Sequence, residues 1–499
     1  MMDDRRQLAG SIPAAEVGNA FIERLTHFAQ IKPDAFAAWG PGGQRLTHAD
    51  QLRLVRGFAA CLAGQGCSPG DLVWISLRNP LLDAVVTLAC LHQGLVSCSS
   101  VQAEAPPPTL KPQCVVTDYA QDWVQGLACL RVDQALLDAL RPQPLAPHQW
   151  GADDVARLLL SSGTTGRPKA VMLSHAQLVR RASGRQDSIS SGREPSLTLM
   201  RLASGPGVRL LLAAVLHGDA FHHANNPNSA LDTMLGHSIV GLQASPVQLR
   251  ALCQLMRARG ISAPSIRETW ITGGLLDPTV ARQWRSLAPN LAHLYCGYGS
   301  SETGGAAYFE DGVDAVQDGS LGWAAPGVQL RIVDDAGCTL PAGHSGRVAI
   351  HSDWVALGYW NEPELQQRCF RDGWFHSNDI GSLSADGELL LQGRSEEVIN
   401  IGGVKANPDE LDQRVLLFAG VKDAATFRIR HPDGGDAVGL ALVLEGGELD
   451  REAFRAHLLA TFGVTLFPAH VWRVEGIPRN AMGKVSRQQL AQRLLRRAP

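Results

Sequence analysis

The most informative run of the sequence is Leu158-Leu159-Leu160-Ser161-Ser162-Gly163-Thr164-Thr165-Gly166-Arg167-Pro168-Lys169. Its apolar start predicts a buried strand, which runs directly into hydroxyls, glycines and a cation. Glycines let backbone N–H groups approach phosphate oxygens, the hydroxyls add donors, and Lys169 adds positive charge. The stretch therefore predicts a strand that ends in a phosphate-binding loop. It is not a Walker loop, because the spacing G-x-x-x-x-G-K-[ST] is absent.

The regions on both sides of this stretch alternate between helical patterns and short apolar runs. Between about residues 14 and 150, the run Leu72–Leu77 is typical of a strand. A second series extends from near Arg157 to about residue 325. It contains a helix whose buried face carries Val208, Leu211, Leu212 and Val215. This alternation predicts mostly parallel sheets with helices on their faces.

The C-terminal part of the chain has a different pattern. Short β-rich runs between residues 326 and 392, divided by Gly, Asp and Pro, predict an antiparallel sheet or a small barrel. Asn407 and Pro408 then give the cap and first-turn proline of a helix whose apolar stripe is Leu411, Val415 and Phe418. The last hundred residues therefore predict a small α+β domain.

Composition limits the class of protein. The 499 residues suggest about three domains. Hydrophobic residues are 45% and charged residues 19%, which predicts a globular chain rather than a disordered one. A net charge of −3 gives no bulk attraction to nucleic acid or to an anionic membrane. Ten scattered cysteines without a C-x-x-C pair predict reduced thiols and a cytoplasmic location, and we expect neither a secretory signal nor a membrane span.

Further motifs follow the loop in a fixed order, and the set resembles the adenylate-forming superfamily of acyl- and aryl-CoA synthetases, peptide-synthetase adenylation domains and luciferases. The pattern is closest to freestanding acyl-CoA synthetases and covers nearly the whole chain. The motifs that carry the resemblance, besides the loop, are Gly273-Gly274-Leu275, Tyr298-Gly299-Ser300-Ser301-Glu302-Thr303, Gly373-Trp374-Phe375-His376-Ser377-Asn378-Asp379, Gly393-Arg394-Ser395-Glu396-Glu397 and Pro478-Arg479-Asn480-Ala481-Met482-Gly483-Lys484-Val485.

The resemblance implies a two-domain fold that combines α/β and α+β parts. Residues 1–394 are expected to form a large ATP- and acid-binding domain, built from parallel-sheet αβαβα subdomains and a small β-barrel. Residues 395–499 are expected to form a small mobile domain that carries the catalytic lysine. The hinge between them is predicted at about residues 395–396.

The resemblance also implies roles for single residues. The phosphate loop contributes Ser161, Ser162, Gly163, Thr164, Thr165, Gly166 and Lys169. The nucleotide and acyl site adds Gly273, Gly274, Leu275, Tyr298 on adenine, Gly299, Ser300, Ser301 on phosphate, Glu302 on Mg²⁺, Asp379 and Arg394 on ribose, Gly403 and Lys405 at the pantetheine arm, and Lys484. Thr164, Glu302 and Lys484 make up the expected catalytic set. A carboxylate such as Asp379 can accept hydrogen bonds from two vicinal hydroxyls, which suits a ribose.

The chemistry implied is activation of a carboxylic acid. The acid attacks the α-phosphate of ATP and expels pyrophosphate, while Mg²⁺ on Glu302 and the ammonium of Lys484 offset the charge. A thiolate then takes the acyl group from acyl-AMP. We predict an AMP-forming acid:CoA ligase with ATP, Mg²⁺ and the co-substrate coenzyme A. Alternatives are a carrier-protein-loading ligase, an enzyme that stops at acyl-AMP, and a silent nucleotide-binding module.

Two sequence features bear on the acid. No Phe-Asp motif that would bind an amino-acid ammonium is present, and Gly299 stands where acetate-selective members carry a bulky aromatic. We therefore expect an acid larger than acetate. Small residues over 202–207 replace an aromatic-His gate, which predicts an open or re-lined pocket or a local change of loop. The identity of the acid, the acceptor thiol, the oligomeric state and the pathway stay open.

Other positions receive structural interpretations or remain open. Ala170 and Ser301 are mild departures from the usual Gly and Thr, and Arg347 replaces a Glu in a strand expected to lie remote from the site. We expect His175 to open a helix, with a catalytic role as the less favoured alternative. Positions with a structural role favoured over a metal or substrate role are Arg209, His217, His222 and His223. For Arg479, phosphate binding and a surface loop are equally open.

Overall fold

The computed structural model describes residues 18–40, 43–100, 105–120, 122–124, 126–141, 143–161, 168–183, 195–274, 276–310, 320–394, 399–401, 404–430, 436–446, 449–479 and 485–495. Over these ranges, no helix has both the length and the apolar character that crossing a bilayer needs.

The strand that leads into the phosphate loop belongs to a seven-stranded sheet. Its order is β18 (Gly358–Tyr359), β8 (Lys169–Ser174), β7 (Val155–Ser161), β4 (Val96–Ser99), β3 (Leu72–Ser76), β5 (Cys114–Thr117) and β6 (Ala128–Arg131). Strands β7 and β8 are antiparallel and pair Ser161 with Lys169. The two ends of the predicted phosphate loop therefore lie side by side at one end of this sheet.

A nine-stranded sheet carries the second series of strands. Its order is β15 (Trp323–Ala324), β14 (Gly304–Glu310), β13 (His293–Ser300), β12 (Glu268–Thr272), β11 (Gly241–Ala244), β9 (Ser196–Thr198), β10 (Phe221–His223), β1 (Phe36–Trp39) and β2 (Arg45–Thr47). The run from β1 to β13 in this order is parallel, and antiparallel strands flank it on both sides. The predicted parallel sheets are confirmed.

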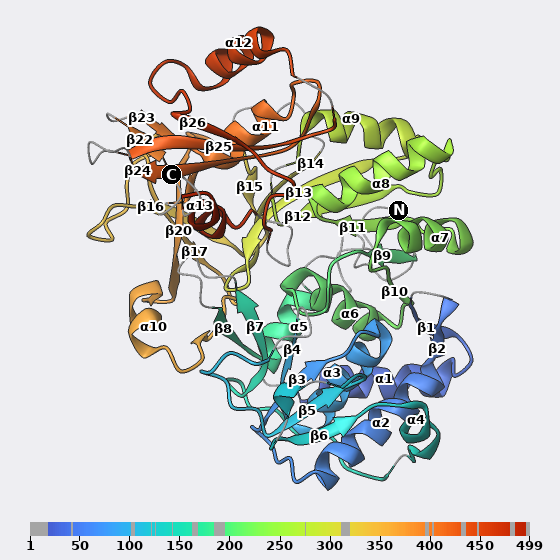
Figure 1. The fold of residues 1–499 in the computed structure, drawn as a ribbon. Helices are drawn as coiled ribbons and strands as arrows, with labels where there is room; N and C mark the ends of the chain where they lie inside the picture. The colour runs from blue at the N-terminus through green and yellow to red at the C-terminus, as the bar shows by residue number, and fades with distance from the viewer. Residues whose placement is uncertain are drawn as a thin grey trace, which may run out of the picture.

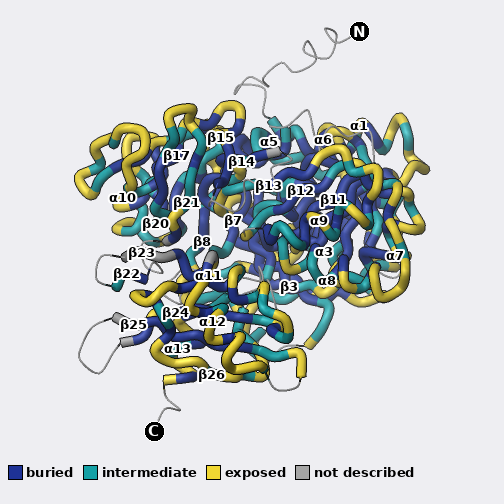
Figure 2. Tube along the Cα trace, turned by 90° about the horizontal axis from the view of Figure 1, so that it is seen from above, coloured by how far each residue is buried: buried dark blue, intermediate teal, exposed yellow. Residues whose placement is uncertain are grey.

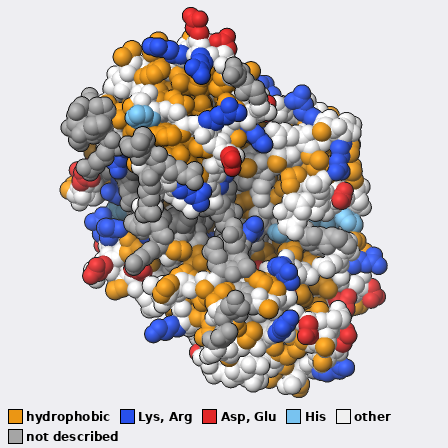
Figure 3. Space-filling view, viewed as in Figure 1, with side chains coloured by type: hydrophobic (Ala, Val, Ile, Leu, Met, Phe, Trp, Pro, Cys, Tyr) orange, Lys and Arg blue, Asp and Glu red, His pale blue; other side chains and the backbone are white. Residues whose placement is uncertain are grey.

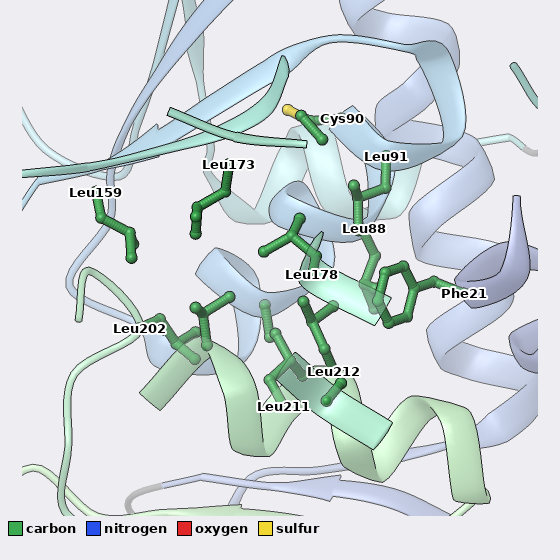
Figure 4. Packing of buried hydrophobic residues seen from close by; sticks show 14 of the residues in the cluster. Phe21, Leu88, Cys90, Leu91, Leu159, Leu173, Leu178, Leu202, Leu211 and Leu212 are labelled. Carbon is green, nitrogen blue, oxygen red and sulfur yellow. The ribbon is translucent and has the colours of Figure 1, made fainter. Parts of the chain in front are cut away.

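Helices pack on both faces of the nine-stranded sheet and form a layer between the two sheets (Figure 1). The inner group is α1 (Ala20–Ile31), α2 (His48–Gly64), α3 (Pro80–Gln93), α5 (His175–Ser183) and α6 (Gly205–His217), and the outer group is α7 (Pro227–His237), α8 (Pro246–Arg259) and α9 (Pro278–Leu287). Two short pieces, α4 (Gln134–Ala139) and η3 (Asp122–Val124), accompany the seven-stranded sheet. Figure 4 shows Leu159 and Leu173 of this sheet facing Leu211 and Leu212 of α6.

The core between the sheets follows from strand alternation. Leu159 of β7 faces the helices, while its neighbour Leu158 packs in a separate cluster on the outer face. The predicted stripe of α6 is buried. Burial is continuous through the central strands and falls off in the outer loops (Figure 2). The strand end that carries Ser161 is thus anchored by a buried core.

A third, antiparallel sheet confirms the prediction for residues 326–392. It contains β16 (Gln329–Val333), β17 (Gly346–His351), β20 (Trp374–Leu383), β19 (Phe370–Arg371) and β21 (Leu389–Arg394), with α10 (Pro363–Cys369) beside it. Strand β20 places Asp379 directly opposite Arg394 of β21.

The C-terminal residues form their own sheets and core clusters (Figures 1 and 2). Their elements are β22 (Ile399–Ile401), β23 (Val404–Ala406), α11 (Pro408–Val415), β24 (Val421–Arg430), β25 (Asp436–Leu444), α12 (Arg451–Phe462), β26 (His470–Arg473) and α13 (Arg487–Leu495). Asn407 caps α11, because its Oδ1 accepts from the N–H of Asp409 at 3.0 Å. The helix ends at Val415, so Phe418 packs on the same core from beyond the helix. The predicted hinge lies outside the described residues.

Candidate nucleotide and acid site

The ends of the phosphate loop are the part of it that the structure describes. Ser161 closes β7 and Lys169 opens β8. The Lys169 ammonium lies 5.8 Å from the ring centroid of Tyr359, which is within range of a cation–π contact. Ser162, Gly163, Thr164, Thr165 and Gly166 lie outside the described residues. Their predicted contacts with phosphate stay predictions.

The predicted magnesium residue follows a tight turn at the end of β13. Two hydrogen bonds hold this turn, from the Ser300 N–H to the Thr303 Oγ1 at 3.0 Å and from the Thr303 N–H to the Ser300 Oγ at 3.2 Å. The chain then returns as β14 at Gly304, whose φ is +64°. Glu302 therefore sits at the tip of this hairpin with 7% of its surface exposed.

The same turn explains Gly299. A Cβ at this position would lie 1.9 Å from the carbonyl oxygen of Gly304. Backbone packing of the hairpin thus requires a glycine here. The lack of a side chain at Gly299 consequently does not by itself report the size of the acid, and the expectation of an acid larger than acetate stays a prediction.

Two residues that the sequence analysis missed hold Glu302. The Tyr359 hydroxyl donates to Glu302 Oε1 at 2.8 Å. Arg181, on α5, donates to the backbone carbonyl oxygens of Ser301 at 2.9 Å and Glu302 at 2.8 Å. Although part of the Arg181 side chain is exposed, desolvation among these carbonyls lowers its pKa to about 9, and the charge of Glu302 opposes that shift. Arg181 therefore keeps its positive charge at neutral pH.

The predicted ribose residues lie together on the other side of the hairpin. The Tyr298 hydroxyl donates to Asp379 Oδ2 at 2.5 Å, although the two residues are 81 positions apart. Asp379 pairs across the sheet with Arg394. The prediction that Arg347 is remote from the site is wrong. Its guanidinium donates to the Ser377 carbonyl and to Asn378 Oδ1, both at 3.2 Å, directly before Asp379, because β17 pairs with β20.

The glycines predicted to line adenine and the acyl group come at the end of β12. Gly273 has a φ of +91°, and a Cβ on Gly274 would lie 3.6 Å from Pro246 at the start of α8. Leu275 lies outside the described residues. Since β12 and β13 are neighbouring parallel strands, their carboxyl ends bring Gly273 near the Tyr298 turn, at the edge where open α/β sheets bind ligands.

The small residues at 202–207 have a local structural reason. Ser204 caps α6 by accepting from the Gly207 N–H at 3.3 Å. A Cβ on Gly207 would lie 2.1 Å from the Arg201 carbonyl oxygen, so the chain needs a glycine there. The buried Arg157 donates to the Leu202 carbonyl at 2.7 Å and fixes the preceding turn. This arrangement accounts for the segment as the start of a helix, and the re-lined pocket stays a prediction.

The structure describes only some of the predicted C-terminal site residues. Gly403, Lys484 and the side chains of Arg394 and Lys405 lie outside the described part. Arg479 forms an ion pair with Asp423 at 2.5 Å, and a β-bridge joins Arg479 to Val485. The bridge brings together the two ends of the segment that carries Lys484. The ion pair favours a structural role for Arg479.

His175, His222 and His223 are buried within the fold. His175 opens α5, as predicted, and stacks on Trp150 with ring centroids 5.5 Å apart. Burial lowers the pKa of His175, His222 and His223 to about 4 each, which keeps these rings neutral. The described ranges contain no cluster of three or more His, Cys, Asp or Glu that could hold a metal ion.

The fold and the geometry define a multi-sheet α/β protein whose candidate site lies at the carboxyl ends of the parallel strands β12 and β13. The sequence profile of the family described as AMP-binding enzyme matches residues 25–360. The chain therefore belongs to the AMP-binding enzyme family, and the predicted adenylate-forming resemblance is confirmed.

Individual relatives cover nearly the whole chain. A fatty acid–[acyl-carrier-protein] ligase, MmaC, of Mycobacterium marinum is 27% identical over 94% of this chain and 97% of its own length. A feruloyl-CoA synthase of an Amycolatopsis species is also 27% identical, over 93% and 97%. The crystal structure of ATP-bound MatB from Rhodopseudomonas palustris superposes with a TM-score of 0.82 at 24% identity and covers 95% of this chain and 99% of that chain. This last likeness confirms the predicted fold.

Proposed function

We propose that the protein is an ATP-dependent acid:CoA ligase that forms acyl-AMP, releases pyrophosphate and then transfers the acyl group to coenzyme A. The observation that carries the proposal is the convergence of three separate sequence regions. Lys169 lies against Tyr359, Tyr359 donates to Glu302, and Tyr298 donates to Asp379. The Tyr298–Glu302 turn thus carries a carboxylate that is held by Tyr359. Lys169 contacts Tyr359, and Asp379, the predicted ribose acceptor, contacts Tyr298.

The described residues fit a magnesium ion bound together with a nucleotide. Mg²⁺ takes one or two carboxylates and completes its shell with phosphate oxygens and water, so a full protein cage is not needed. Glu302 supplies one such carboxylate, and it is already oriented by Tyr359. When bound, the ion neutralises charge on the phosphates. Tyr359 and Arg181 hold Glu302, and Lys169 and Lys484 supply further positive charge to the phosphates.

The chain's own residues divide the remaining work. Asp379, which pairs with Arg394 across the sheet, accepts hydrogen bonds from the ribose hydroxyls. Tyr298 lies against the adenine. Lys484 approaches the α-phosphate in the first half-reaction. We propose that residues 395–499 move as a unit about a hinge at 395–396, which brings Gly403 and Lys405 to the pantetheine arm in the second half-reaction.

A carrier-protein thiol is the second candidate acceptor. It is favoured by the name of the Mycobacterium marinum relative, which is as similar to this chain as the feruloyl-CoA synthase is. Both acceptors present the same pantetheine thiol, so the chemistry of the acid-activating site is common to the two candidates. We also propose a cytoplasmic location, which the ten free cysteines support.

Exchange of labelled pyrophosphate into ATP across a panel of aliphatic, aryl and dicarboxylic acids tests the proposal. We expect exchange that depends on one class of acid. A lack of exchange with every acid of the panel would overturn the proposal that the protein activates an acid. A thioester assay with the active acid, offering coenzyme A and a phosphopantetheinylated carrier protein in parallel, then identifies the acceptor, and transfer to the carrier alone would replace the first candidate by the second.

A further inference from the structure

We propose that Tyr359 is a positioning residue that sets the orientation of the Glu302 carboxylate for a metal-bound nucleotide and ties it to Lys169. The inference rests on the proposed function, because it takes Glu302 as the residue that meets the metal. It adds a residue from outside the loop and the motifs that predicted the site.

The backbone around Tyr359 is firmly fixed. Strand β18 pairs with β8 and places Tyr359 opposite Val171, two residues from Lys169. Hydrogen bonds on both sides of Tyr359 continue this pairing, from the Leu357 N–H to the Met172 carbonyl at 3.0 Å and from the Trp360 N–H to the Ala170 carbonyl at 2.8 Å. The side chain is 4% exposed and meets Phe370 edge-on at a centroid distance of 5.4 Å. The ring therefore has little freedom to move.

The hydroxyl at the end of this ring is a hydrogen-bond donor to Glu302. A tyrosine hydroxyl keeps its proton at neutral pH, so next to a carboxylate, which only accepts, it is the donor. The hydrogen bond occupies Glu302 Oε1 at 2.8 Å. The ring itself lies under the Lys169 ammonium at 5.8 Å. One side chain thus contacts both the cation of the phosphate loop and the carboxylate at the hairpin tip.

The main chain of Glu302 is fixed from the same side. Its carbonyl accepts from Arg181 at 2.8 Å and from the Ala356 N–H at 2.7 Å. Arg181 also donates to the Trp354 carbonyl at 2.9 and 3.0 Å. Segment 354–359 therefore binds Glu302 by both its backbone and its carboxylate, and within the described residues the hydroxyl of Tyr359 is a donor that orients the carboxylate.

The substitution Tyr359→Phe removes this hydroxyl and keeps the ring. We expect it to weaken binding of Mn²⁺·ATP about tenfold, since a hydrogen bond to a charged group contributes about 1.5–3 kcal/mol and 1.4 kcal/mol is tenfold. Binding of ATP without metal, in EDTA, should change less than about twofold, because the cation–π contact with Lys169 is retained. Calorimetry gives both dissociation constants, and Mn²⁺ electron paramagnetic resonance reports the bound metal independently of turnover.

The matched control is Tyr119→Phe, which removes a tyrosine hydroxyl that lies 3.0 Å from Ser76 Oγ and does not touch Glu302. It should leave both dissociation constants unchanged. A purely structural role of Tyr359 would lower the melting temperature and weaken both forms of ATP alike, and that result would overturn the proposal. So would an unchanged affinity for Mn²⁺·ATP.

The second variant is Arg181→Lys, which keeps the charge but loses the planar set of donors to three carbonyls. It should also weaken Mn²⁺·ATP more than metal-free ATP. Failure of the positioning role can be distinguished from failure of the proposed function. A metal-specific loss in Tyr359→Phe together with no acid-dependent exchange in the wild type would retain the positioning role and reject the ligase. Wild-type protein that binds ATP equally with and without Mn²⁺ would reject the positioning role.

Discussion

The two acidic side chains of the site, Glu302 and Asp379, are held in different ways. Glu302 is 7% exposed, and its carboxylate accepts a hydrogen bond from the buried Tyr359. Its backbone carbonyl accepts hydrogen bonds from Arg181 and from the Ala356 N–H. Asp379 is half-buried on a sheet strand and accepts from Tyr298, whose ring is itself a predicted ligand contact. The first carboxylate is set before any ligand arrives, while the second has a donor that ribose hydroxyls can replace.

The difference suits the two tasks that we propose for these residues. A carboxylate that meets a metal must be fixed, because charge stabilisation in a transition state depends on groups that need no reorganisation. A carboxylate that recognises hydroxyls can exchange one neutral donor for another at little net cost. We therefore expect changes at Glu302 to affect the rate and changes at Asp379 to affect binding of ATP.

The largest effect is expected for Glu302→Gln. The amide still accepts from Tyr359 but carries no charge, so the rate of acid-dependent pyrophosphate exchange should fall about 10²–10³-fold, the size seen when one electrostatic stabiliser is removed. Measurements at saturating ATP isolate the rate. The control Glu364→Gln changes an exposed residue of α10 and should stay within about twofold of wild type. A rate for Glu302→Gln near that of the control would contradict the role of Glu302.

A smaller effect is expected for Asp379→Ala. Loss of the ribose acceptor should raise the KM for ATP about tenfold with less change in kcat, because the contact is made in both the ground state and the transition state. The wild type should also prefer ATP over 2′-deoxy-ATP, and the variant should lose that preference. If Asp379→Ala still prefers ATP over 2′-deoxy-ATP, another residue recognises the ribose 2′-hydroxyl. The exposed Asp386, in the turn after β20, is the matched alanine control.

The smallest effect, and the sharpest for the comparison, is expected for Tyr298→Phe. The ring stays, but the hydroxyl that occupies Asp379 Oδ2 is removed, so ribose no longer has to displace that hydroxyl. The KM for ATP should fall about threefold, because water replaces much of the lost hydroxyl in the free variant and only part of the energy of a hydrogen bond to a charged group is gained. A raised KM would mean that the Tyr298 hydroxyl itself binds the nucleotide and that Asp379 is as fixed as Glu302.

Much of the fold could be predicted from local pattern. Apolar runs and caps near Leu72, Val208 and Asn407 each gave the element that the structure contains, because strand alternation and helix capping are set by neighbouring residues. Figure 3 shows Lys and Arg side chains spread over the visible face, consistent with the near-neutral charge.

Tertiary contacts could not be predicted in the same way. Arg180 and Arg181 look alike in sequence, but only Arg181 reaches the carbonyls of Ser301 and Glu302, 120 and 121 positions away. Tyr359 acquires its role through a strand pairing with residues near 171. A local pattern does not show the pairing of β17 with β20, which brings Arg347 next to Asn378. The sequence relates Gly299 to the size of the acid pocket. The structure shows instead that the close approach of the Gly304 backbone leaves no room for a side chain at this position.

The proposed role of Lys484 in acid activation can be tested by measuring the two half-reactions separately in Lys484→Ala. If Lys484 offsets charge during adenylation, acid-dependent pyrophosphate exchange should fall at least about 10²-fold, while thioester formation from supplied acyl-AMP stays within about threefold of wild type. The control Lys422→Ala, at an exposed lysine of β24 in the same part of the chain, should leave both unchanged. Equal loss of the two half-reactions in Lys484→Ala, or no loss of exchange, would contradict the account.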